Sequence, residues 1–333
     1  MTNTSRGRIH AEMLRVLLSS DHRGESKFAK KKELKDKVDA LKKEHPEEKV
    51  PMEHVKGLYA HCSVDNYLKE ALLFLKFADS KNGDEKHLPN LRKYAGAYIQ
   101  DCKDRDLSAP TIYKRATVLG TLFHCHATNF GVALPKRERK DIKRTRSVPA
   151  SIGTRYTEGE KYKPIRDFII ATGCRRSELI KLKFESLYKD KNGSLVMKIK
   201  GKGGKVRESP VFPGMEDIVR QALAQSSGYG NKGEHVFPKN WVPTKMAVHQ
   251  YRAKYAQNLY DRYLSQGLGI GEPGNVKKIY YCRKERTGQA YYKNILLLVS
   301  EALGHGRWDV VVNNYFYADW KPCIPFDSTP AQK

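Results

Sequence analysis

Long apolar runs are scarce in this sequence. Its apolar stretches are short, as in residues 295–299, whereas a helix needs roughly 20 consecutive apolar residues to span a bilayer. Residues 1–6 include no apolar segment of the kind that a secretory signal contains. We therefore expect neither a membrane partner nor a secreted protein.

The cysteines lack the spacing of a metal or redox site. They stand at positions 62, 102, 125, 174, 282 and 323, and none belongs to a C-x-x-C pair, which argues against a zinc ribbon and a thioredoxin-like centre. His124, Cys125 and His126 are adjacent, but adjacent side chains on a helix point in different directions. The sequence therefore predicts free thiols in a reducing cytosol and no metal site.

Signatures of nucleotide and metal chemistry are missing as well. No G-x-x-x-x-G-K-[ST], H-E-x-x-H or G-x-S-x-G pattern occurs. The acids of the second half do not form the tight cluster that a two-metal nuclease needs. We expect no cofactor and no ATP-driven reaction.

Acidic residues are outnumbered, and the resulting positive charge is the strongest compositional feature. The 333 residues include 62 Lys and Arg against 37 Asp and Glu, which gives a formal net charge of +25. A folded chain this basic usually binds a polyanion such as a nucleic acid; a highly soluble surface or a ribosome-associated protein is the alternative. The hydrophobic content of 39% is enough for ordinary cores, and the length suggests two domains.

Composition and periodicity divide the chain into five segments. Residues 1–57 predict a charged helical N-terminal extension, and residues 58–134 predict a helical domain whose apolar side chains recur at helical spacing. A basic linker follows over 135–149. Residues 150–317 predict a mixed domain, and residues 318–333 form a tail.

The linker contains the most basic run of the chain. Residues 136–146 include seven Lys or Arg and two acids, between Pro135 and Pro149. Such a run is a solvated linker, a linker that crosses a phosphate backbone, or both. The side chains expected to contact DNA here are Lys136, Arg137, Arg139, Lys140, Lys143 and Arg144.

The second half combines helices with a hairpin. Apolar and polar residues alternate over 194–200 as in a half-buried strand, a glycine-rich turn follows, and 206–212 predicts the return strand. Thr157 and Glu160 resemble a capping box before a helix that Gly173 ends. Further helices are expected over 177–182, 243–265 and 286–303. The expected fold class is mainly α with a small antiparallel sheet (α+β).

Four segments of the second half stand out together. They are T-G-C-R-R-S-E-L at 172–179, K-G-K-G-G-K-V-R at 200–207, Y-Y-C-R at 280–283 and L-G-H-G-R-W at 303–308, with Tyr315 soon after. In this order and at these approximate spacings they resemble the tyrosine recombinases, the phage-integrase family of DNA strand-exchange enzymes. The resemblance covers about residues 57–320, and it implies a helical core-binding domain that contacts DNA and a tyrosine-recombinase catalytic domain.

The first two segments match the family's phosphate-binding residues. Arg175 follows the Gly173 break, where the family places its first catalytic arginine; the planar guanidinium binds two oxygens and keeps its proton. Glu178 matches an acid that orients an arginine or histidine. Lys202 matches the family's general-acid lysine, and Lys205 is its rival and a further DNA contact.

The third segment departs from the family's H-x-x-R pattern, because Tyr280 stands at its first position. A phenol can hydrogen-bond a phosphate oxygen, but its pKa of about 10 makes it a poor base at neutral pH. Arg283 is the expected second arginine, because it lies 22 residues before His305, close to the family spacing. Arg286 is the alternative.

The fourth segment supplies a histidine and the nucleophile. His305 matches the family's second histidine, which is expected to hydrogen-bond the scissile phosphate. The family usually places its nucleophile nine residues later, where this chain has Asn314. Tyr315 follows at ten residues and is the expected nucleophile, with Tyr317 as the runner-up.

The resemblance implies a site-specific recombinase or integrase of a phage, integrative element or plasmid. Such an enzyme cuts and rejoins duplex DNA through a 3′-phosphotyrosine and a Holliday junction, without metal or ATP. The expected partners are double-stranded DNA, further copies of the chain in a homotetramer on two recombination sites, and accessory DNA-bending factors. The expected location is the nucleoid in the cytoplasm of a prokaryotic host, and the tail 318–333 is expected to dock on a neighbouring protomer.

Three other functions fit the same residues. A type IB topoisomerase shares the catalytic set but religates the same strand, and some hairpin telomere resolvases also have a non-histidine in the third segment. A DNA-binding protein with a degenerate site would not be an enzyme. A Tyr315 variant separates enzyme from binder, and two-site exchange against plasmid relaxation separates recombinase from topoisomerase.

Overall fold

The chain folds into two compact units, Met1–Lys143 and Arg144–Lys333. The division falls within the predicted linker. The computed structural model describes residues 1–48, 55, 57–81, 85–136, 138, 159–201, 204–227, 236–237, 242–244, 246–268, 278–283, 286–317 and 320–322.

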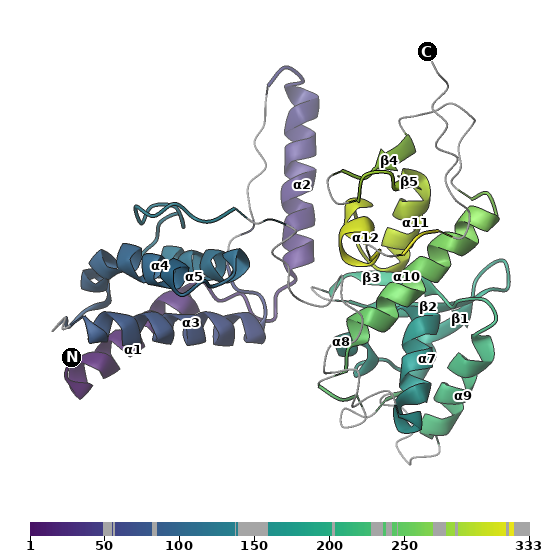
Figure 1. Cartoon of the computed structure of the whole chain (residues 1–333), viewed down its shortest axis with the longest axis horizontal. Coiled ribbons are helices and arrows are strands. Elements are labelled where there is room, and N and C mark those ends of the chain that lie inside the picture. The colour runs from purple at the N-terminus through teal and green to yellow at the C-terminus, as the bar shows by residue number, and fades with distance from the viewer. Residues whose placement is uncertain are drawn as a thin grey trace. The chain divides into compact units, whose positions relative to one another are not determined.

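The first unit is built from helices (Figure 1). They are α1 (Asn3–Ser19), α2 (Lys27–Glu44), α3 (His61–Ser80), the 3₁₀ helix η1 (Leu88–Tyr94), α4 (Ala95–Asp104) and α5 (Ala109–Leu122).

The apolar faces of α1, α3, α4 and α5 meet in one core. Ile9, Met13 and Leu17 recur at helical spacing along α1, and all three are fully buried in this core. The stripe of α5 that includes Ile112 and Ala116 is buried in the same core. The first helix of the segment expected as an extension is therefore an integral part of the helical unit.

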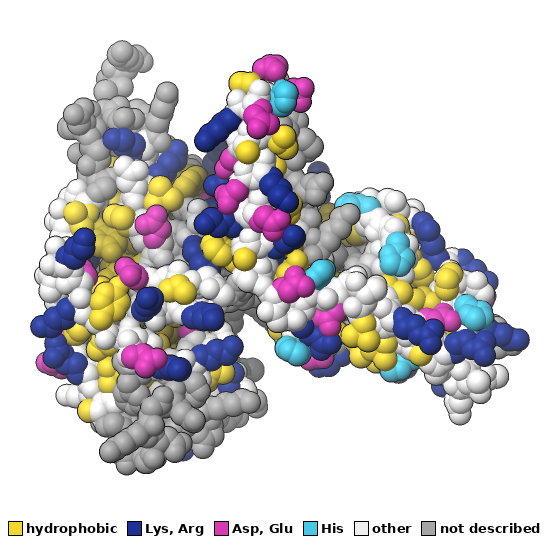
Figure 2. Space-filling view, turned by 180° about the vertical axis from the view of Figure 1, so that it is seen from behind, with side chains coloured by type: hydrophobic (Ala, Val, Ile, Leu, Met, Phe, Trp, Pro, Cys, Tyr) yellow, Lys and Arg dark blue, Asp and Glu magenta, His cyan; other side chains and the backbone are white. Residues whose placement is uncertain are grey.

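The helix α2 differs from its neighbours, because its surface is mostly charged. Figure 2 shows basic and acidic side chains mixed along this helix, with apolar side chains among them. Val38 is its buried residue, and Ser26 caps the helix by accepting a hydrogen bond from the N–H of Ala29.

The second unit combines helices with two small sheets (Figure 1). Its helices are η2 (Glu160–Tyr162), α7 (Lys163–Thr172), α8 (Arg176–Leu179), η3 (Phe184–Ser186), α9 (Glu216–Ser227), α10 (Val248–Ser265), α11 (Lys293–Ala302) and α12 (Asp309–Asn314). Its strands are β1 (Leu187–Lys189), β2 (Leu195–Lys200), β3 (Val206–Pro210), β4 (Ile279–Tyr281) and β5 (Ala290–Tyr292).

The predicted hairpin is confirmed. β2 pairs antiparallel with β3, from Val196 opposite Pro210 to Lys200 opposite Val206, and β1 pairs on the other side of β2. A second antiparallel pair joins β4 and β5. The helix expected over 286–303 is therefore too long at its start: residues 290–292 pair with β4, and α11 begins only at Lys293.

The helix α10 is central to the second unit, because it packs against α7 and also against α11. Tyr255 and Tyr260 on α10 are almost fully buried in the core that α11 and α12 share. The fold class is mainly α with small antiparallel sheets, as the sequence predicts. None of the helices that the structure describes is long and apolar enough to cross a membrane.

Candidate active site

A glycine break places Arg175 at the start of a helix. Gly173 ends α7 in the left-handed conformation, with φ of 62°, and a Cβ there would lie 2.4 Å from the ring of Tyr255. Glycine is therefore required by both conformation and space. The chain then turns, and Arg175 becomes the residue that caps α8, with its side chain 28% exposed.

Glu178 is the carboxylate around which the arginines gather. Arg175 donates to it from its backbone N–H (2.7 Å to Oε2) and from Nη1 (2.6 Å to Oε1). Arg207 of β3 donates to both oxygens, at 2.7 and 2.8 Å, and Nη1 of Arg252 lies 3.9 Å from Oε2. Burial opposes ionisation of Glu178, but these hydrogen bonds and positive charges outweigh it and lower its pKa to about 2. The ionised carboxylate therefore fixes three guanidinium groups from three different elements.

Arg252 on α10 is a site residue that the sequence analysis missed. Its side chain is 1% exposed, and its Nε donates to the Tyr315 hydroxyl at 3.1 Å. Its other two guanidinium nitrogens donate to the carbonyls of Gly173 and Leu303. The guanidinium is thus held rigidly between the end of α7, the end of α11 and the tyrosine.

His305 and Tyr315 meet directly. Gly304 turns the chain after α11, with φ of 76°, and a Cβ there would lie 2.7 Å from Arg207. This turn brings His305 Nε2 to 2.9 Å from the Tyr315 hydroxyl and 3.2 Å from Arg175 Nη2. Tyr315 itself directly follows α12 and is 3% exposed. The phenol therefore lies between an arginine and a histidine.

The protonation of His305 follows from its neighbours. Burial and the charges of Arg175 and Arg252 lower the pKa of His305 to about 3. The imidazole is therefore neutral at pH 7. An arginine can only donate, so Nε2 of His305 is an acceptor toward Arg175. Tyr315, which receives a hydrogen bond from Arg252, can direct its own proton to the same lone pair of Nε2, which it then shares with Arg175.

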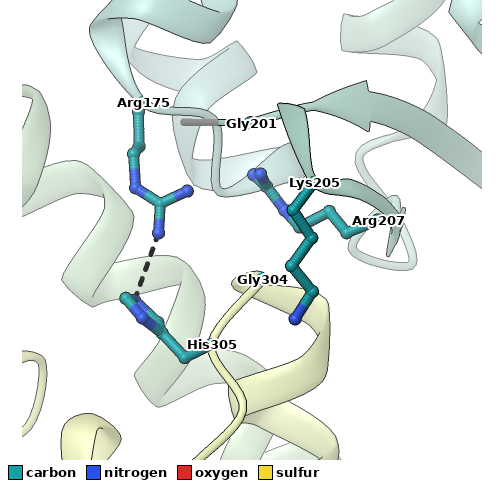
Figure 3. Close-up of a pocket in the computed structure, with 6 residues that line it drawn as sticks. All are labelled: Arg175, Gly201, Lys205, Arg207, Gly304 and His305. Carbon is teal, nitrogen blue, oxygen red and sulfur yellow. Dashed lines mark hydrogen bonds between the residues drawn. The ribbon is translucent and has the colours of Figure 1, made fainter. Parts of the chain in front are cut away.

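A cationic pocket adjoins this cluster. It has a volume of about 330 Å³ and is lined by Arg175, Gly201, Lys205, Arg207, Gly304 and His305. Figure 3 shows Arg175 pointing toward His305, while the Lys205 side chain extends toward the turn that holds Gly304. The charged groups among these lining residues are all basic, so the pocket suits an oxyanion such as a phosphate group.

Arg207 and His249 are further site residues that the sequence analysis missed. The His249 ring lies 4.9 Å from the ring of Tyr315, and Nε2 of His249 is 3.1 Å from the carbonyl oxygen of Asn314. His249 and Arg252 form an H-x-x-R pattern within the predicted helix 243–265, a spacing that puts both on one helix face. The signal was present, but Arg252 lies 53 residues before His305 (305 − 252), whereas Arg283 lies 22 residues before it, close to the family spacing.

The third predicted segment does not join the cluster. The Arg283 side chain is exposed and has no hydrogen bond or ion pair with any described residue. Tyr280 packs on Trp308, with ring centroids 4.7 Å apart. Arg286 is buried and donates to the carbonyls of Val312 in α12 and of Phe316 after it. The place expected for Arg283 beside the tyrosine and histidine is held by Arg252, because α10 packs directly against this part of the unit.

The remaining predicted residues have simple placements. Lys136 is exposed, and Tyr317 is partly buried against the core that includes Tyr315. Six predicted site residues lie outside the described residues: Lys202, Arg137, Arg139, Lys140, Lys143 and Arg144.

Cysteines and acids of the described residues form no metal-type cluster, since no three His, Cys, Asp or Glu side chains converge there. Cys174, next to Arg175, is fully buried, and burial raises the pKa of its thiol to about 11. This thiol is therefore inert at neutral pH.

Comparison with known proteins gives a likeness of fold. No family model and no curated protein matches the sequence. The structure of the XerH site-specific recombinase bound to difH substrate, a pre-cleavage complex, matches with a TM-score of 0.51 and 16% identity over 94% of each chain. A post-cleavage complex of XerH on a palindromic difH substrate gives 0.49 and 16% over 94% of this chain and 93% of that one. The XerA recombinase gives 0.33 and 14% over 86% and 94%. At this level of identity the first match establishes a shared fold and nothing more.

Proposed function

We propose that this chain is a tyrosine recombinase that cuts and rejoins duplex DNA through a covalent bond between Tyr315 and a 3′-phosphate. One observation carries the proposal. The Tyr315 hydroxyl is hydrogen-bonded by Arg252 at 3.1 Å and by His305 at 2.9 Å, beside a pocket lined by basic side chains. A phenol in this setting has what a phosphoryl-transfer nucleophile requires: a proton acceptor, a cation next to its oxygen and an adjoining anion site.

The first step is attack on a backbone phosphate. A bond forms between the Tyr315 oxygen and phosphorus, and the bond from phosphorus to the 5′-oxygen breaks. The tyrosine proton passes to Nε2 of His305, which lies 2.9 Å from the hydroxyl oxygen. Arg175, which lines the pocket, stabilises the charge on the non-bridging oxygens, while Arg252 holds the attacking Tyr315 oxygen. A bound phosphate also raises the basicity of His305 by offsetting the nearby positive charges.

The leaving 5′-oxygen needs a proton. The β2–β3 hairpin carries the two candidate donors, Lys202 and Lys205. Lys205 lines the pocket beside His305, and glycines on both sides of Lys202 allow close approach to DNA. We assign the proton donation to Lys202, with Lys205 as the residue that holds the phosphate backbone.

Strand exchange follows when the free 5′-hydroxyl of a second duplex attacks the phosphotyrosine. A bond forms between its oxygen and phosphorus, and the bond from phosphorus to the Tyr315 oxygen breaks. The hydroxyl proton passes to the lysine that gave up its proton in the first step, and His305 returns its proton to Tyr315. Because one ester replaces another, the reaction needs no ATP. Two such rounds pass through a Holliday junction, which requires a homotetramer on two recombination sites, with accessory DNA-bending factors where the site demands them. Support for DNA as substrate comes from the net charge of +25 and from the shared fold with XerH, whose structure holds difH substrate.

The domains divide these tasks. Residues 58–134 form the core-binding domain, the basic linker 135–149 crosses the phosphate backbone, residues 150–317 carry the catalysis, and the tail 318–333 docks on a neighbouring protomer. The helix α1 shares its core with the helical domain, so the segment 1–57 supports that domain. We place the enzyme in the nucleoid of a prokaryotic host, as the integrase of a phage, integrative element or plasmid.

The test is a covalent trap. A nicked suicide duplex captures the enzyme on DNA, and the peptide attached to DNA identifies the nucleophile. Tyr315→Phe should abolish attachment and keep DNA binding. Tyr317→Phe is the matched control and should keep attachment, because it is the hydroxyl of Tyr315 that lies within hydrogen-bond distance of Arg252 and His305. Attachment that survives in Tyr315→Phe would overturn the proposal, and two-site exchange without plasmid relaxation would separate it from a topoisomerase.

A further inference from the structure

The segment that carries the nucleophile is held at its end by side chains from elsewhere. The helix α12 has six residues, and a helix this short is unstable without tertiary support. Its last carbonyls have no partner within the helix. Nη1 of Arg286 donates to the carbonyls of Val312 and Phe316, at 3.1 and 3.2 Å. These two carbonyls flank Tyr315 in the sequence.

Arg286 is itself fixed in place. It is 4% exposed, its Nε donates to Gln289 Oε1 at 2.6 Å, and its Nη2 donates to the Tyr291 hydroxyl at 2.7 Å. Every nitrogen of the guanidinium thus has an acceptor inside the protein. Arg286 is not among the described residues that line the cationic pocket, so its action on the chemistry must pass through the backbone beside Tyr315.

The β4–β5 pair, between whose strands Arg286 lies in the sequence, contacts residues on both sides of α12. On β5, the Tyr291 ring packs on Phe316, with centroids 5.1 Å apart. On β4, the Tyr280 ring packs on Trp308, which directly precedes α12, at 4.7 Å. The β4–β5 pair lies between α10 and α11 in the chain, so it joins the helix that carries Arg252 to the helix that precedes His305.

We infer that the β4–β5 segment is a brace for the nucleophile, with Arg286 as the positioning residue of Tyr315. The inference rests on the proposed function of Tyr315. A nucleophile must be held close to its reacting geometry, and a displacement of about 1 Å can reduce the rate roughly 100-fold. By fixing the carbonyls on either side of Tyr315, Arg286 keeps the hydroxyl within reach of Arg252 and His305.

The experiment compares Arg286→Gln with Arg283→Gln in the full chain. Arg283 is a matched control, because it lies three residues away and its exposed side chain has no described partner. In Arg286→Gln, the single-turnover rate of covalent attachment should fall about 10-fold or more, while DNA affinity stays within about 2-fold because the pocket is untouched. Arg283→Gln should attach at the wild-type rate.

Hydrogen exchange provides a readout that does not depend on cleavage. The amides of Tyr315 and Phe316 donate to the Val311 carbonyl, so their exchange should accelerate in Arg286→Gln while exchange in the β2–β3 hairpin stays unchanged. If this variant does not fold, Tyr291→Phe, which removes one acceptor of Arg286, should show the same two effects at smaller size. The brace would be overturned if the wild type attaches to DNA and these variants attach at the same rate, with amide exchange at Tyr315 and Phe316 also unchanged. Absence of attachment in the wild type would instead refute the proposed function, and faster exchange would still support the brace.

Discussion

Glu178 is the most sensitive point of the cluster, and Glu178→Gln tests its role. The substitution keeps the size of the side chain and removes its charge. Arg207 and Arg252, at 4% and 1% exposure, would then lie close together with Arg175 and without their counter-ion. Unpaired buried charge is strongly destabilising, so the second unit should lose stability and the arginines should lose their positions.

The magnitude follows from the pKa of Glu178, which is lowered from 4.5 to about 2. Each pKa unit corresponds to ~1.4 kcal/mol, so the ionised form stabilises the fold by about 3 kcal/mol relative to a neutral one. For a unit of this size, that is a decrease in Tm of roughly 6–12 °C. Because the folded-state pKa is depressed, this stabilisation is complete above pH 4.5 and is lost as the pH falls toward 2.

The assay is denaturant unfolding of wild type, Glu178→Gln and Glu185→Gln at pH 7 and at lower pH. Glu185 is the matched control, because its side chain is 79% exposed and its ion pair with Lys183 is long, at 3.7 Å; its loss should cost under ~1 kcal/mol. The gap between wild type and Glu178→Gln should narrow as the pH falls below 4.5. A gap under ~1 kcal/mol at pH 7, or one that does not depend on pH, would refute the view that this carboxylate holds the arginines together.

Further predictions concern charge, assembly and DNA affinity. In the free protein, the imidazole NMR signals of His305 should not titrate between pH 5 and 8, because its pKa lies near 3, and Arg175→Gln should move its titration upward; a midpoint near 6.5 in the wild type would contradict the cluster. A mixture of Tyr315→Phe and Arg252→Gln proteins should not recover covalent attachment, because both groups of the hydrogen-bonded pair come from one chain; recovered attachment would indicate a site shared between protomers. Lys136→Gln should weaken binding to all DNA sequences and reduce the slope of log affinity against log salt by ~0.9, whereas an unchanged slope would place this lysine in solvent.

Local sequence determined the elements of the site. Alternation over 194–200 with a glycine turn gave the β2–β3 hairpin, because strand periodicity and turn conformation depend on neighbouring residues. Gly173 predicted the end of α7, and with it the position of Arg175 at a helix start. The L-G-H segment and the tyrosine ten residues later identified two side chains that the structure brings to 2.9 Å.

Tertiary packing decided which arginine joins them. Arg283 satisfied the expected spacing and Arg252 did not, yet Arg252 lies against Tyr315, because α10 packs on the core that α11 and α12 share. The sequence also did not indicate that Arg207 is buried in an ion pair with Glu178, or that Arg286 donates to a carbonyl near the end of α12. The sequence does not distinguish an arginine that faces solvent from one that binds a phosphate or a backbone carbonyl. The acceptors of its guanidinium come from elements that are distant in the sequence, so only the tertiary structure determines its role.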